Sequence, residues 1–66
     1  MEKVQFLCRG TRVTITTGRY AGQTGTVDAN AFQTTEDYPT EYSAALHVVL
    51  NTGRVVTLRW DQVKSR

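Results

Sequence analysis

Three closely spaced glycines, Gly18, Gly22 and Gly25, constrain the fold of this 66-residue chain more than any other feature. Residues 12–16 before them alternate polar and apolar side chains, the period-two pattern of a half-buried strand. The loop 18–22 is rich in glycine, which adopts the positive φ angles that tight turns require. Gly25 falls inside the next expected strand, where glycine indicates a bulge, a bend or close approach of another backbone. The pattern predicts two strands joined by a tight loop, with the second strand bent.

The second half of the chain carries further strand signals. Residues 45–50 and 54–60 are rich in β-branched and apolar residues, and the loop 51–53 between them ends in Gly53, as expected of a hairpin. Residues 60–63 resemble a short 3₁₀ turn, after which a last short strand is expected. Alternation places one set of side chains in the core: Val13, Ile15, Leu46, Val48, Leu50, Val56, Leu58 and Trp60, with Val63 returning to it.

The segment 28–43 allows two interpretations. The flanking strands extend outward as a long hairpin with its tip near residues 36–40, or the segment is a mobile acidic loop. Long loops are uncommon in small domains, and Phe32, Tyr38 and Tyr42 are unusual for a disordered segment, so we favour the hairpin. Glu36 and Asp37 are then expected to be solvated acids at its tip.

Length and composition predict a single domain over residues 1–66, with residues 1–9 peripheral to it. Cys8 is the only cysteine, so no internal disulfide forms, and we expect an inert, partly buried thiol. Cys8 and His47 are too few for a zinc site, which needs about four ligands. No apolar run is long enough to span a membrane. A free cysteine without a targeting segment suggests a cytoplasmic protein.

Residues 10–27 resemble the KOW motif, which occurs in NusG-type transcription-elongation factors and in several large-subunit ribosomal proteins. The matching positions are Gly10, Val13, Ile15, Gly18, Gly22, Gly25 and Val27. The likeness continues to about Val63 and implies an all-β fold, a small five-stranded SH3-like barrel of the KOW type, with an extended hairpin or loop between strands 2 and 3. The chain differs from the family in having Ala21 and Gln23 where basic residues are common, and Thr11 where Asp is usual.

The resemblance also implies a binding function, because KOW domains bind RNA or proteins, often within ribosomes or transcription complexes. The charges of this chain are segregated: residues 1–27 carry four basic side chains and one acidic, residues 28–42 carry four acidic and none basic, and residues 43–66 again carry four basic and one acidic. Arginine binds phosphate through paired N–H groups, and tyrosine stacks on bases. The predicted nucleic-acid surface consists of Arg12, Arg19, Tyr20, Gln23, Arg54 and Arg59. Scattered solubilising charges, with Tyr20 covering one end of the core, are the alternative.

A second interpretation is contact with a protein partner, or self-association, through the acidic and aromatic segment 28–43. Its expected contact residues are Phe32, Tyr38 and Tyr42, because aromatic side chains are enriched in interface cores. The sequence contains no nucleophile–base arrangement, phosphate-binding glycine loop or metal-ligand spacing. We therefore expect a non-catalytic module without a cofactor, a metal or a small-molecule substrate.

Overall fold

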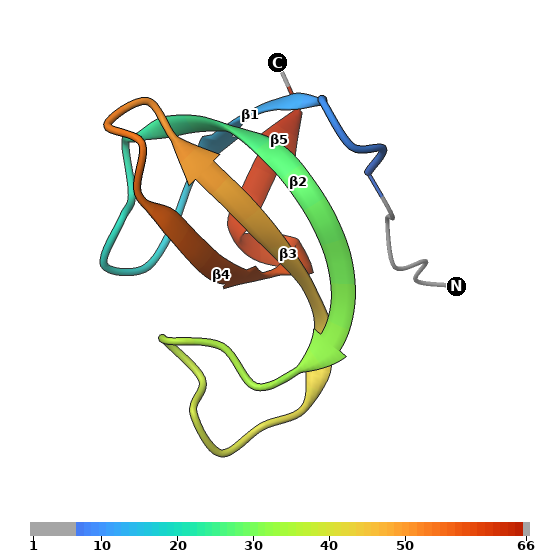
Figure 1. Cartoon of the computed structure of the whole chain (residues 1–66). Coiled ribbons are helices and arrows are strands. Elements are labelled where there is room, and N and C mark those ends of the chain that lie inside the picture. Colours follow the sequence, from blue (N-terminus) through green and yellow to red (C-terminus); the bar gives the residue numbers. More distant parts are fainter. Residues whose placement is uncertain (1–6, 66) are drawn as a thin grey trace.

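A computed structural model of the chain describes residues 7–65, which form five strands and one 3₁₀ turn. The elements are β1 (Arg12–Ile15), β2 (Thr24–Gln33), β3 (Ser43–Leu50), β4 (Val55–Arg59), η1 (Trp60–Gln62) and β5 (Val63–Ser65). All neighbouring strands are antiparallel, in one sheet of order β4-β3-β2-β1-β5 (Figure 1). The predicted all-β class is confirmed. In the described part of the chain β4 and β5 are not paired, so the sheet is open. No helix there has the length and apolar character needed to cross a bilayer.

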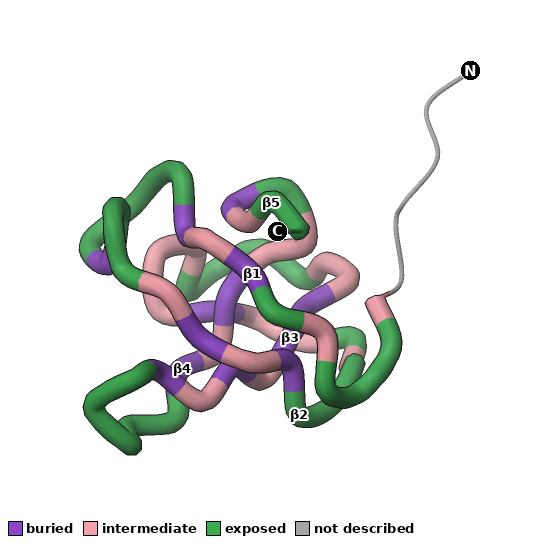
Figure 2. Tube along the Cα trace, turned by 90° about the horizontal axis from the view of Figure 1, so that it is seen from above, coloured by how far each residue is buried: buried purple, intermediate pink, exposed green. Residues whose placement is uncertain are grey.

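The sheet bends around a small apolar core (Figures 1 and 2). Most of the alternating positions expected to face inward are buried, in β1, β3 and β4. Trp60 and Val63 are only half-buried, because they lie where β4 ends and β5 begins. Cys8 is exposed rather than partly buried, since it belongs to the turn before β1. The core residues are Val13, Ile15, Tyr20, Val27, Leu46, Val48, Leu50, Val56 and Leu58.

Gly25 allows β2 and β3 to approach each other closely. A Cβ atom at this position would lie 2.6 Å from the carbonyl oxygen of Val49 and 2.7 Å from Cγ1 of Val48. Both distances are shorter than non-bonded carbon atoms tolerate, so any larger residue would force the strands apart. Of the three roles expected for this glycine, close approach is the one observed. The β-bulge lies further along β2, between Val27 and Ala29.

The segment 28–43 is a hairpin, as favoured from the sequence, because β2 and β3 remain paired as far as Gln33 and Ser43. Glu36 and Asp37 at its tip fold back onto the β1–β2 loop, whereas residues 39–42 are exposed. The loop 34–42 is closed by mutual backbone hydrogen bonds between Thr35 and Tyr38 (3.4 and 3.2 Å), and its acidic side chains contact the β1–β2 loop. The expectation of a solvated acidic tip is therefore wrong.

Candidate interaction surfaces

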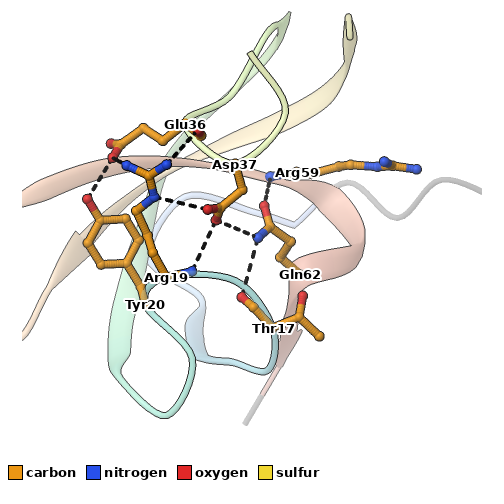
Figure 3. Close-up of polar contacts among 7 residues, drawn as sticks. All are labelled: Thr17, Arg19, Tyr20, Glu36, Asp37, Arg59 and Gln62. Carbon is orange, nitrogen blue, oxygen red and sulfur yellow. Dashed lines mark hydrogen bonds and ion pairs between the residues drawn. The ribbon is translucent and has the colours of Figure 1, made fainter. Parts of the chain in front are cut away.

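Gln62 is the centre of a polar cluster that connects the hairpin loop to the rest of the sheet (Figure 3). Its side chain is fully buried, at 1% exposure. The side-chain oxygen accepts a hydrogen bond from the backbone N–H of Arg59 (2.8 Å). The amide nitrogen donates to Oδ2 of Asp37 (2.9 Å) and to the carbonyl oxygen of Thr17 (3.3 Å). Both ends of the buried amide are thus satisfied, as burial requires.

Asp37 joins this buried amide to Arg19 in the β1–β2 loop. Nε of Arg19 lies 3.0 Å from Oδ1 of Asp37, and the Arg19 Nη2 donates to the carbonyl oxygen of Glu36 (3.0 Å). Gly18 leaves room for this contact, since a Cβ there would overlap Asp37 Oδ2 and Gln62 Nε2. We call Thr17, Arg19, Tyr20, Glu36, Asp37 and Gln62 the Asp37 cluster (Figure 3).

These contacts shift the ionisation of the cluster. Hydrogen bonds from Gln62 and then from Arg19 lower the pKa of Asp37, although partial burial acts in the opposite direction. The pKa of Arg19 is raised, first by its hydrogen bond to Asp37. Both residues are held in their charged forms, so the arginine is engaged by the protein's own carboxylate.

Tyr20 belongs to the core and to the same cluster. The residue is 9% exposed, and its hydroxyl donates to Oε1 of Glu36 (2.6 Å). This bond raises the pKa of Tyr20, with burial as the next cause. The guanidinium carbon of Arg54 lies 5.8 Å from the centre of the ring. Tyr20 therefore covers one end of the core and does not present a free ring face for a base.

Arg59 is also engaged by the hairpin. Its Nη1 lies 2.7 Å from Oε1 of Glu41, and its Nε lies 3.2 Å from Oδ1 of Asp61. The guanidinium carbon lies 4.6 Å from the centre of the Tyr38 ring, a cation–π distance. Tyr38 is half-buried and packs against Arg59. The other two aromatic residues of the hairpin, Phe32 and Tyr42, are exposed.

A different basic surface lies on the outer side of β1 and β5. Arg12 is exposed on β1, and Lys64 is exposed on β5 opposite Thr14, its neighbour on the same face. Thr26 of β2 lies opposite Arg12 and continues this face. Within residues 7–65 neither cation forms an ion pair with an acidic side chain. Gln23 and Arg54 are also exposed: Gln23 follows Tyr20 in the β1–β2 loop, and the Arg54 guanidinium lies beside the Tyr20 ring.

Two aromatic side chains are strongly exposed at the base of the hairpin loop. Phe32 is 72% exposed and Tyr42 is 69% exposed. Their rings are stacked, with centroids 6.2 Å apart and an interplanar angle of 29°. The third exposed large apolar residue, Val55, lies on β4 at the other end of the sheet. No pocket is present in the part of the chain that the structure describes, so these candidate sites are surfaces.

The structure thus separates the residues predicted from the sequence. Of the six predicted nucleic-acid contacts, Arg19, Tyr20 and Arg59 bond to acidic residues of the hairpin loop. Arg12, Gln23 and Arg54 have no such acidic partner within residues 7–65. The central role of Gln62 was not predicted. Its one sequence signal is its place three residues after Arg59, where a Gln side chain reaches back to the N-terminal backbone of a helical turn.

Comparison of the chain with protein-family models, with curated protein sequences and with solved structures finds no match in any of the three.

Proposed function

We propose that the chain is a non-catalytic binding module, an SH3-like barrel of the KOW type, that contacts a protein partner through Phe32 and Tyr42. The barrel proposal is supported by the strand order, in which β1 lies between β2 and β5, and by the 3₁₀ turn before β5. The motif glycines support it too, since Gly25 occupies the close approach of two strands.

The exposed aromatic stack is the observation that carries the protein-binding proposal. Contiguous exposed apolar patches on soluble proteins often mark contact sites, and Phe32 and Tyr42 form such a patch. Phe32 and Tyr42 already touch each other, so a partner would bury both rings with little additional ordering of the side chains. Burial of apolar surface is favourable by roughly 25 cal/mol per Å² before the costs of association are subtracted.

Site-specific photo-crosslinking tests this proposal. A benzophenone amino acid in place of Phe32 is expected to give a discrete cross-linked protein in the cells that make the chain. The same amino acid in place of Val55 is the matched control, because Val55 is also an exposed apolar strand residue but lies away from the stack. Cross-links of equal yield at both positions, or none at Phe32, would contradict the proposal.

Nucleic-acid binding is a second candidate function, favoured by Arg12 and Lys64 of the outer face, which form no ion pair within residues 7–65. The proposed nucleic-acid surface consists of Arg12, Gln23 and Arg54 from the predicted set, together with Lys64. It leaves out Arg19 and Arg59, which bond to the hairpin loop. Two or three cations imply modest affinity, because the sequence-independent part of nucleic-acid binding comes from the phosphates neutralised and the counterions released.

The second candidate is tested by fluorescence anisotropy with single-stranded RNA at low salt. We expect log K to fall with log salt with a slope of about −1.5 to −2, as for two or three phosphate contacts on a single strand. Arg12→Gln should weaken binding, whereas Arg9→Gln should not, since Arg9 already lies beside Asp28 (3.5 Å). No anisotropy change at the lowest salt, or an equal effect of both substitutions, would exclude this function.

A further inference from the structure

We infer that the partner is a second copy of this chain, joined through the free edge of β2; the inference rests on the proposed contact at Phe32 and Tyr42. β1 pairs with β2 only from Thr24 to Thr26. The last backbone hydrogen bonds on that side connect Val27 with Gly10 (2.7 Å) and Thr11 (2.9 Å). Beyond Val27, no strand within residues 7–65 pairs with this side of β2 (Figure 1).

The free edge exposes the backbone of two residues. Leu50, an even-numbered residue of β3, bonds to Arg54 on the β4 side, so the odd-numbered residues of β3 bond to β2. Their partners on β2 are Ala29, Ala31 and Gln33. The N–H and C=O groups of Asn30 and Phe32 therefore point away from β3, toward the side on which no strand within residues 7–65 pairs with them. The hydrogen bond from Asn30 to the carbonyl of Leu7 uses the side chain only (2.8 Å).

This edge lacks the features that usually prevent strand pairing. Residues 29–33 contain no charged residue and no proline, although the bulge at Asp28 precedes them. The two edge strands of the sheet are better protected: β5 has three residues and carries Lys64, and β4 ends in the charged Arg59. Short strands and charged side chains are the common means of blocking an edge, so β2 is the edge most open to pairing.

A second copy fits this edge by two-fold symmetry. Antiparallel pairing centred on Ala31 places Asn30 of one copy opposite Phe32 of the other, and the exposed backbone groups then form four hydrogen bonds. No charges face each other across the axis. The two Phe32 rings become diagonal neighbours within aromatic reach, and each also touches its own Tyr42. The exposed stack of each copy would thus be covered by the other.

Sedimentation velocity under reducing conditions, which exclude disulfides through the exposed Cys8, tests the inference. We expect a monomer–dimer equilibrium with a dissociation constant between about 10 µM and about 1 mM, which corresponds to a weak dimer. Ala31→Lys and Ala31→Glu should each be monomeric, because like charges would meet at the two-fold axis. An equimolar mixture of the two variants should dimerise. A monomeric wild type at about 1 mM, or a mixture that stays monomeric while each variant is folded, would overturn the inference.

Hydrogen exchange of the wild-type protein provides a test that does not depend on variants. The amides of Asn30 and Phe32 should become protected as concentration rises, whereas those of Ala29, Ala31 and Gln33 should be protected throughout. Protection of Asn30 and Phe32 that is independent of concentration would mean that the edge is covered within one chain, and would refute the dimer. A cross-link from position 32 to a different protein would also refute it while leaving the proposed function intact. Absence of any cross-link would remove both.

Discussion

Replacement of Asp37 by alanine is expected to destabilise the protein by about 1–3 kcal/mol, the cost of leaving a buried polar group without its partner. The carboxylate is 16% exposed and accepts a hydrogen bond from the buried Gln62 amide. Without the carboxylate, the nitrogen of that amide retains only the Thr17 carbonyl at 3.3 Å, the long limit of a hydrogen bond. Loss of the ion pair between Arg19 and Asp37 adds less to this cost, because the Arg19 guanidinium is mostly exposed and water replaces the carboxylate.

The expected loss of about 1–3 kcal/mol for Asp37→Ala is a large fraction of the free energy of unfolding of the protein. A 66-residue domain has a free energy of unfolding of roughly 3–10 kcal/mol, and each kcal/mol shifts Tm by about 4–8 °C at this size. Urea denaturation at pH 7, followed by the fluorescence of the single tryptophan, Trp60, measures the difference directly. Glu41→Ala is the matched control. Glu41 also pairs with an arginine of the sheet, but it is 56% exposed, so its pair contributes about 0–1 kcal/mol.

The pH dependence separates this explanation from a general packing defect. The pKa of Asp37 is lowered in the folded protein, so its contribution is present above the unfolded value of about 3.9 and is lost as pH falls through the lower, folded value. The difference between wild type and Asp37→Ala should be constant near neutral pH and should shrink below about pH 4. A difference below about 0.5 kcal/mol at pH 7, or one equal to that of Glu41→Ala, would refute a stabilising role for the Asp37–Gln62 contact.

Two further predictions concern Tyr20 and Gly25. The hydrogen bond to Glu36 raises the pKa of Tyr20, so the stability that this bond contributes is present below about pH 10 and is lost as pH rises through the folded pKa. Wild type should therefore lose stability in alkali more steeply than Tyr20→Phe, as measured by urea midpoints. Identical alkaline profiles of the two proteins would contradict the bond. Gly25→Ala should destabilise the protein by about 1–3 kcal/mol or more, because the added Cβ overlaps Val49. Gly22→Ala should cost less, about 1–2 kcal/mol, because Gly22 has a left-handed backbone but open surroundings. Thermal unfolding in which Gly22→Ala is the more destabilised variant would contradict this prediction.

Much of the sheet could be predicted because its signals are local. Alternation identified the buried positions of β1, β3 and β4, and the turn at Gly53 and the 3₁₀ turn at residues 60–62 were expected from their composition. The hairpin at residues 28–43 was favoured over a mobile loop because of its aromatic residues, and the structure has the hairpin. The bulge at Asp28 could not be predicted, since one extra residue in a strand leaves no compositional signal.

The candidate surfaces were harder to predict because charge in a sequence does not show which partner it meets. Arg19 and Arg59 look like phosphate-binding residues until the hairpin loop returns acidic side chains to them across 17 or 18 residues of chain. Exposure of Phe32 depends on β2 extending past the core, which alternation alone does not reveal. Pairing over such distances is a property of the tertiary fold, so of the predicted set only Arg12, Gln23 and Arg54 have no acidic partner among the described residues.

The pairing of β1 with β5 determines the order in which the protein can be completed. Val13 pairs with Ser65, and both the backbone and the hydroxyl of Thr16 bond to the Gln62 carbonyl, 46 residues away. Contacts this distant in sequence require closure of a long loop, and folds rich in them assemble slowly, in milliseconds to seconds. During synthesis, the side of β1 that pairs with β5 therefore stays unpaired until residues 62–65 have left the ribosome. The β2–β3–β4 meander can form earlier, so a nascent chain would present β1 as its exposed edge during that interval.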